Sequence, residues 1–142
     1  MDAVILLNSR AFPDQVCPEH LFQMDVTPIL EDLNDAQRQA VTAPAKPTLV
    51  IAGAGSGKTR VLVHRAAWLI DVDGVSPHSL LAVTFTNKAA AEMRHRIEAL
   101  LNVPVQHLWI GTFHGLAHRM LRRHWREAKL PQNFQIIDSD DQ

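Results

Sequence analysis

The predicted fold follows from one segment, Ala52-Gly53-Ala54-Gly55-Ser56-Gly57-Lys58-Thr59. It stands between an apolar run at residues 48–51, which predicts a strand, and a segment of helical periodicity that begins near Lys58. Three glycines within five residues permit backbone conformations that a Cβ atom would exclude. Successive N–H groups can then turn inward and form a cradle for an anion, closed by the start of the helix.

Two side chains at the end of this segment have the chemistry of a triphosphate site. Lys58 brings a positive charge to the β- and γ-phosphates, and the Thr59 hydroxyl is a ligand for Mg²⁺. The segment departs from the G-x-x-x-x-G-K-[ST] pattern only at Ala52, a position that ends the strand. A flexible glycine linker is the alternative, but linkers do not pair glycines with a buried strand. The segment predicts binding of a nucleoside triphosphate, or descent from a protein that bound one.

Composition places the chain among ordinary soluble domains. It has 142 residues, of which 46% are hydrophobic and 20% charged. The net charge of −1 requires any nucleic-acid contact to come from a local basic patch. The single cysteine excludes an internal disulfide framework and suits a reducing compartment. Because the sequence has neither an apolar run of membrane-spanning length nor a convincing secretory signal, it predicts a cytoplasmic protein.

Two features precede the phosphate-binding segment. Residues 1–23 show no sustained period and contain two prolines, so we expect a poorly ordered extension rather than a packed extra strand. Asn34 then predicts the N-cap of a helix, and Gln37 stands where the reciprocal side chain of a capping box belongs. The Gln37 amide is both donor and acceptor, so the alternative is that it reads the edge of an adenine.

Strand and helix patterns alternate after the phosphate-binding segment. Apolar runs at 80–85 and 108–110 predict strands, and helical spacing predicts helices over 58–70, 87–101 and 113–128. The last helix is expected to bury one face, made of Leu116, Ala117, Met120, Leu121 and Trp125. The alternation predicts an α/β fold with a parallel sheet and helices on both faces.

Polar residues beside an aromatic ring follow two of the predicted strands. The segments are Thr84-Phe85-Thr86-Asn87-Lys88-Ala89-Ala90 and Gly111-Thr112-Phe113-His114-Gly115. Ligands of open α/β sheets bind beyond the carboxyl ends of the strands, and rings at such a place can stack on unpaired bases. The alternative puts both rings in the core and uses the threonine and asparagine side chains as helix caps. Two similar segments on consecutive strands favour a track for a single nucleic-acid strand.

The C-terminal part of the sequence carries basic residues but no metal pattern. Arg119, Arg122, Arg123 and Arg126, with Lys129 beyond them, form either a solvated face or a contact to a nucleic-acid backbone. The histidines, eight in all, show no spacing of a closed zinc site, so we predict no structural zinc. Residues 134–137 are strand-like, and Ser139 with Gln142 has capping-box spacing. We therefore do not assign Asp138 to Mg²⁺, and we expect the sequence to be a fragment.

Four segments together resemble the superfamily 1A DNA helicases, most closely the UvrD/Rep/PcrA group. They are Leu33-Asn34-x-x-Gln37, residues 52–59, residues 84–93 and residues 111–115. The resemblance covers residues 24–142. It implies a RecA-like first motor domain over 24–114, which binds ATP and Mg²⁺, and the start of an inserted helical subdomain over 115–142. It also implies that Gln37 reads adenine and that residues 84–90 and 112–114 contact single-stranded DNA.

The sequence departs from this family in what it lacks. Neither the family's Asp-Glu-x-Gln motif nor its second motor domain is present in these 142 residues. The resemblance implies that the full-length protein is an ATP-dependent DNA helicase that acts in DNA unwinding or repair. Its implied partners are duplex junctions and repair proteins. This chain alone should bind nucleotide weakly and hydrolyse it negligibly. A non-catalytic nucleotide- or DNA-binding module and another P-loop NTPase are the alternatives. A GTPase is excluded because Ala90 replaces the aspartate of Asn-Lys-x-Asp.

Overall fold

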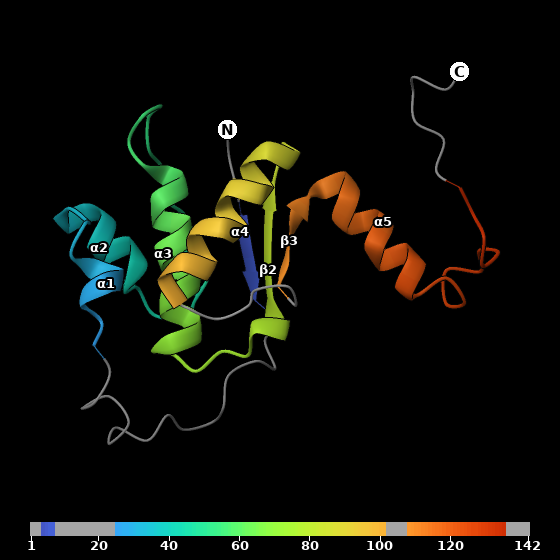
Figure 1. The fold of residues 1–142 in the computed structure, drawn as a ribbon, viewed down its shortest axis with the longest axis horizontal. Helices are drawn as coiled ribbons and strands as arrows, with labels where there is room; N and C mark the ends of the chain where they lie inside the picture. The colour runs from blue at the N-terminus through green and yellow to red at the C-terminus, as the bar shows by residue number, and fades with distance from the viewer. Residues whose placement is uncertain (1–3, 8–24, 102–107, 136–142) are drawn as a thin grey trace.

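The computed structural model of the chain describes residues 4–7, 25–101 and 108–135 (Figure 1). Its elements, in chain order, are β1 (Val4–Leu7), α1 (Thr27–Leu30), α2 (Asp35–Val41), α3 (Lys58–Asp71), the 3-10 helix η2 (Pro77–Ser79), β2 (Leu80–Thr84), α4 (Asn87–Leu101), β3 (Trp109–Thr112) and α5 (Phe113–Arg123). Within these ranges no helix is both long enough and apolar enough to cross a membrane.

The sheet has three strands in the order β1-β2-β3. β2 and β3 are parallel, in a register that pairs Leu81 with Trp109 and Thr84 with Thr112. β1 runs antiparallel to β2 and places Val4 opposite Val83. Alternating helices and strands around a parallel pair confirm the α/β class that the sequence predicts.

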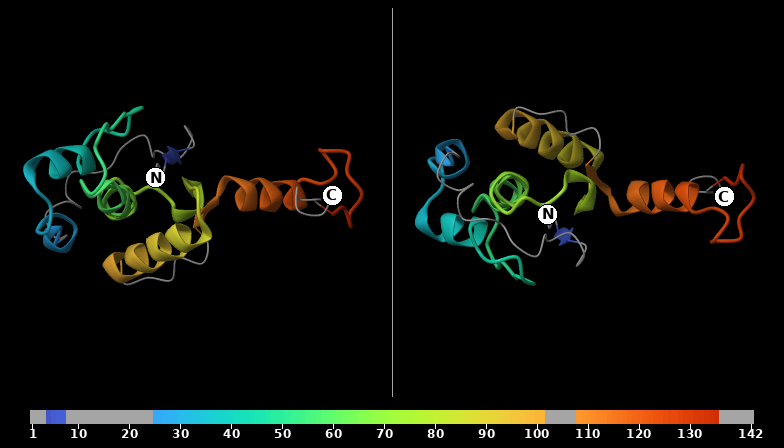
Figure 2. Two further views of the ribbon diagram at one scale, coloured as in Figure 1. Left: turned by 90° about the horizontal axis from the view of Figure 1, so that it is seen from above. Right: turned by 90° about the horizontal axis from the view of Figure 1, so that it is seen from below.

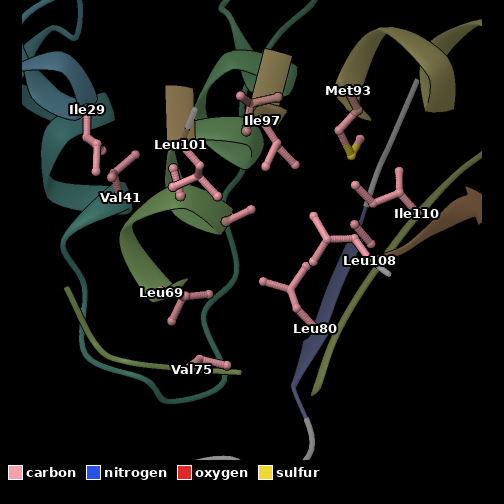
Figure 3. Close-up of a cluster of buried hydrophobic side chains, with 14 of the residues drawn as sticks. Ile29, Val41, Leu69, Val75, Leu80, Met93, Ile97, Leu101, Leu108 and Ile110 are labelled. Atoms are coloured by element: carbon pink, nitrogen blue, oxygen red, sulfur yellow. The ribbon is translucent and has the colours of Figure 1, made fainter. Parts of the chain in front are cut away.

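The core lies between this sheet and the long helices α3 and α4 (Figure 3). The continuous apolar sequence of β2 is buried almost throughout, as expected for a central strand. Along α3 and α4 the buried apolar positions recur at helical spacing, so each helix turns one stripe inward. They are Val63, Ala66, Ala67 and Leu69 of α3, and Ala90, Met93, Ile97 and Leu101 of α4.

The helices are distributed unevenly about the sheet. α3 and α4 pack against each other on one side of it (Figures 1 and 2). α5 begins at the end of β3, buries Leu116 in its first turns and then extends away from the sheet (Figure 2). The expected cover of both faces is therefore found only in part among the described residues. The first turns of α3, α4 and α5 all lie at one end of the molecule, the upper end in Figure 1, where β2 and β3 also end.

In the N-terminal half, the structure differs from one expectation in full and from a second over four residues. Residues 48–51 do not form a strand, and Leu49 and Ile51 are 83% and 89% exposed. A strand requires a neighbour that supplies hydrogen bonds, and in this sheet β1, not residues 48–51, pairs with β2 on the side away from β3. The expected lack of order in the N-terminal extension does not hold for Val4–Leu7, which forms β1. The rest of residues 1–23 lies outside the described residues.

α5 is shorter and less buried than the sequence predicts. It ends at Arg123 rather than near Ala128, and a turn follows in which the Leu130 N–H donates to the Trp125 carbonyl. Of the five residues expected in its buried face, only Leu116 is buried; Ala117, Met120 and Leu121 are exposed and Trp125 is half-buried. The reason is that α5 leaves the sheet after its first turns. Residues 134–135 form no strand, and the expectations for 136–142 fall outside the described residues.

Candidate nucleotide and nucleic-acid sites

The phosphate loop, residues 52–59, runs into the first turn of α3. Gly55 and Gly57 have φ angles of +76° and +83°, and Gly57 is the N-cap of the helix. Residues with a Cβ are strained in this left-handed region. At Gly57 an added Cβ would also lie 2.7 Å from the Gln37 Nε2 atom. The prediction that the backbone requires glycine is therefore confirmed at these two positions.

The polar side chains of the phosphate loop bond to its own carbonyl groups. Lys58 Nζ donates to the carbonyls of Ala52 at 2.8 Å and Gly53 at 3.0 Å. The Ser56 hydroxyl also donates to the Gly53 carbonyl, at 2.7 Å. The ammonium group is thus held at the loop by neutral acceptors, which are weaker partners than an anionic phosphate. Thr59 follows in the first turn of α3 and is half-buried. Contacts of Lys58 with phosphate and of Thr59 with Mg²⁺ stay predictions.

Gln37 links helix α2 to the phosphate loop. Its Oε1 accepts from the Asn34 N–H at 3.2 Å, and its own N–H donates to Asn34 Oδ1 at 2.9 Å, which confirms the capping box. Its Nε2 donates to the Ser56 carbonyl at 3.0 Å. Both ends of the amide are therefore engaged, and one N–H and one oxygen lone pair remain for a further partner. The adenine contact stays a prediction.

Two arginines of α3 position α2 and the segment that leads to the loop. Arg65 donates to the carbonyls of Val41 at 2.7 Å and Pro44 at 3.1 Å. Arg60 donates to the Asp32 carbonyl at 3.2 Å. Burial lowers the pKa of Arg65, partly offset by the nearby negative charge of Asp73. These bonds tie α2 to α3 and thereby fix Gln37 beside the loop.

The carboxylates at the far end of α3 are partly buried but do not gather into a metal site. Burial raises the pKa of Asp71. Burial also raises the pKa of Asp73, against the opposing effects of Arg65 and a hydrogen bond with Trp68. In the part of the chain that the structure describes, no three His, Cys, Asp or Glu side chains are close enough to hold a metal ion together.

The parallel register brings the two predicted nucleic-acid segments together. Thr84 and Thr112 are opposite each other at the ends of β2 and β3, so the residues that follow them are neighbours. The rings of Phe85 and Phe113, here called the aromatic platform, have centroids 5.6 Å apart and planes inclined by 50°. They are 61% and 53% exposed, so the alternative that both rings are core residues is wrong. Bare ring faces of this kind can stack on unpaired bases, and that contact stays a prediction.

The polar residues around the aromatic platform differ in their exposure and in their hydrogen bonds. The hydroxyls of Thr86 and Thr112 accept from the N–H groups of Ala89 and Gly115, each at 3.1 Å, which confirms that both threonines cap helices. Asn87 and His114 are exposed in the first turns of α4 and α5. Thr84 is only 3% exposed, so its side chain is not presented with the others. A shallow, open pocket at this place is lined by Phe85, Thr86, Asn87, Thr112, Phe113, His114 and Gly115.

Sequence reasoning missed the role of Trp109. The guanidinium carbons of Arg119 and Arg123 lie 4.6 Å and 5.9 Å from the centroid of its ring. The spacing of the two arginines, one helical turn apart, is visible in the sequence and indicates a common face. Their aromatic partner is on β3, and no local pattern relates that strand to the middle of α5.

The sequence profile of the UvrD/REP helicase N-terminal domain matches residues 33–142. This range contains Gln37, the phosphate loop and both segments of the aromatic platform. The chain belongs to this family. The resemblance to the UvrD/Rep/PcrA group is thereby confirmed, and β1 lies outside the matched range.

Named relatives of this UvrD/REP-family chain are DNA helicases. DNA helicase II of Escherichia coli (strain K12) is 65% identical over 119 residues, which are 84% of this chain and 16% of that protein. DNA helicase II of Haemophilus influenzae is 60% identical over 123 residues, or 84% and 17% of the two chains. The ATP-dependent DNA helicase PcrA of Staphylococcus aureus (strain NCTC 8325) is 47% identical over 114 residues, or 80% and 16%. The chain thus spans about a sixth of the length of these relatives.

Proposed function

We propose that this chain is the ATP- and single-stranded-DNA-binding part of a UvrD-type, ATP-dependent DNA helicase that acts in unwinding or repair. The observation that carries the proposal is the shared position of the two candidate sites. The phosphate loop opens α3, the aromatic platform lies where β2 and β3 end, and both are at the same end of the molecule (Figure 1). Ligands of α/β sheets bind at this end, and a RecA-like motor domain over residues 24–114 would place both sites there.

The residues of the phosphate loop fit a Mg²⁺-bound ATP. Two left-handed glycines shape the backbone, and the Lys58 ammonium already lies at the loop, on carbonyl groups that it can exchange for phosphate oxygens. Thr59, one residue further into α3, would hold Mg²⁺, which neutralises phosphate charge when it is bound. Gln37 would turn its amide from the Ser56 carbonyl to the adenine edge and so select ATP over GTP.

Single-stranded DNA would lie across the aromatic platform. Phe85 and Phe113 supply ring faces for unpaired bases, while Asn87 and His114 supply polar groups at the edge of the same pocket. Thr86 and Thr112 would act by holding the first turns of α4 and α5 rather than by touching DNA. The inserted subdomain would cover residues 115–142, beginning within the first turn of α5, and the full-length protein would work at duplex junctions in the cytoplasm.

Two binding experiments and one rate measurement test this proposal on the 142-residue chain. Calorimetry should show ATP binding that weakens when EDTA removes Mg²⁺, with GTP bound less tightly. Fluorescence anisotropy should show binding of a single-stranded oligothymidine. ATP turnover should be negligible with or without DNA, because Thr59 would be the only protein ligand of the metal and no base would orient the attacking water. Failure to bind either ligand would overturn the proposal. DNA-stimulated turnover that Asp138→Ala eliminates would show that Asp138 is a Mg²⁺ ligand after all.

A further inference from the structure

α5 and the turn that follows it carry an excess of positive charge, although the chain as a whole is slightly acidic. Between Phe113 and Lys129 there are five arginines and lysines and one acid, Glu127, whereas the whole chain has a net charge of −1. Four arginines, all exposed, make up what we call the arginine face: Arg119, Arg122, Arg123 and Arg126. Because α5 extends away from the sheet (Figures 1 and 2), this face is accessible from outside the core of the molecule.

Each guanidinium of the arginine face lies over an aromatic ring. Arg119 and Arg123 share the Trp109 ring, at 4.6 Å and 5.9 Å from its centroid. Arg126 lies 5.1 Å from the Trp125 centroid, and Arg122 lies 5.8 Å from that of Phe134. Arg122 Nε also donates to His118 Nε2 at 2.8 Å. Stacking occupies the flat side of a guanidinium and leaves N–H groups in its plane free to donate.

The arginine face has no acidic partner among the described residues. The ion pairs of the described residues are Arg96 with Glu92 on α4, and His124 with Glu127. Arg122 and Arg123 do stabilise the last turn of α5 through the helix dipole. That effect accounts for two of the four charges and for none of the ring contacts. The rings restrict the arginine side chains before any ligand arrives, which lowers the entropy lost when an anion binds.

We propose that the arginine face binds the phosphate backbone of duplex DNA, as a second surface separate from the aromatic platform. The arginine face can attract a nucleic acid through its positive charge but not through stacking. The reason is that the guanidinium groups lie over the rings on which unpaired bases would stack. A duplex presents charge in the same way, with its bases stacked inside and a regular phosphate on each strand outside. Arg119 lies one helical turn, about 5 Å along the axis of α5, from Arg122 and Arg123, and Arg126 follows in the turn beyond the helix. Guanidinium groups match phosphate oxygens two at a time.

The test uses a short blunt-ended duplex, which has no unpaired bases for the platform, and measures anisotropy over a salt series. Arg122→Gln with Arg126→Gln removes two charges without disturbing the Trp109 contacts. The control, Lys46→Gln with Arg96→Gln, removes two exposed charges elsewhere, of which Arg96 is paired with Glu92. Each lost phosphate contact should lower the slope of log K against log salt by about 1. We expect this slope to fall by about 2 in the arginine-face variant and to equal that of the parent in the control.

Three further results decide the proposal. Circular dichroism should show both double variants folded, and oligothymidine binding should persist in the arginine-face variant. Equal slopes in parent and arginine-face variant, or an equal fall in the control, would overturn the duplex surface. So would a parallel loss of oligothymidine binding, since the two surfaces would then be one. If Phe85→Ala and Phe113→Ala left oligothymidine binding unchanged, that result would count against the proposed function and leave this inference standing.

Discussion

The phosphate loop and the aromatic platform lie at the same end of the molecule but are built in opposite ways. In the loop, Lys58, Ser56 and Gln37 all donate to loop carbonyls, so the polar groups are already paired. At the platform, Phe85 and Phe113 are more than half exposed, and the nearby threonines are used within the protein as caps. A phosphate that binds Lys58 replaces the bonds of this side chain to loop carbonyls, whereas a ligand at the platform only covers bare rings. Charge should therefore dominate at the loop and stacking at the platform.

The largest expected effect tests the role of charge at the loop. Lys58→Ala should abolish measurable ATP binding, because hydrogen bonds to charged groups contribute about 1.5–3 kcal/mol each and this ammonium makes more than one. The fold should persist, since Lys58 bonds only to loop carbonyls. Calorimetry with ATP and Mg²⁺ measures the loss, and Lys46→Ala is the control for a nearby exposed lysine. Equal affinity in Lys58→Ala and parent would remove the loop from the nucleotide site.

The platform variants should have the next largest effect, on the other ligand. Phe85→Ala and Phe113→Ala should each weaken oligothymidine binding by about 1–3 kcal/mol, the usual contribution of a stacked base. ATP affinity and thermal stability should change little because both rings are exposed. Since the rings touch, the double variant should lose less than the sum of the single variants. A loss of folding without a separable binding defect would make the platform a structural contact.

A smaller effect separates the capping-box role of Gln37 from its contact with the phosphate loop. Gln37→Ala should reduce the preference for ATP over GTP and lower the unfolding free energy by about 1 kcal/mol through the lost cap. Asn34→Ala is the matched control, because it breaks the same capping box and leaves the Gln37 amide in place. It should cost similar stability without changing nucleotide preference. If both variants lose stability and neither changes the preference, Gln37 is a capping residue only.

The smallest expected effect is on the free energy of unfolding, and it comes from Asp71, which lies outside both sites. Burial raises the pKa of Asp71 above its ordinary 3.8, so the folded state takes up a proton more readily than the unfolded state. The parent should therefore gain stability as pH falls through the raised pKa, and its charged Asp71 should be unfavourable at neutral pH. Asp71→Asn should be slightly more stable than the parent near pH 7, with the difference gone below about pH 3.8. Urea denaturation across this range measures it, and a pH-independent difference would refute the assignment. ATP and DNA affinities should not change.

The sequence by itself determined the features whose physics is local. A left-handed glycine before Lys58 and the Asn34–Gln37 capping box depend on residues within a few positions of one another, and both are present as predicted. The strand β2 is also predictable, because a continuous apolar run between turns suits a central strand. Helix starts at Lys58, Asn87 and Phe113 follow from the glycines and threonines that precede them.

Only the tertiary structure decided which elements become partners. The run at 48–51 is as apolar as β2, yet Leu49 and Ile51 are exposed, while Val4–Leu7 takes an edge of the sheet. A strand is stable only with hydrogen bonds from a neighbour, and the choice of neighbour depends on the whole chain. The same reason leaves Met120 exposed on α5 and puts Trp109 beneath two arginines. Periodicity indicates which residues share a face, but packing decides what that face meets.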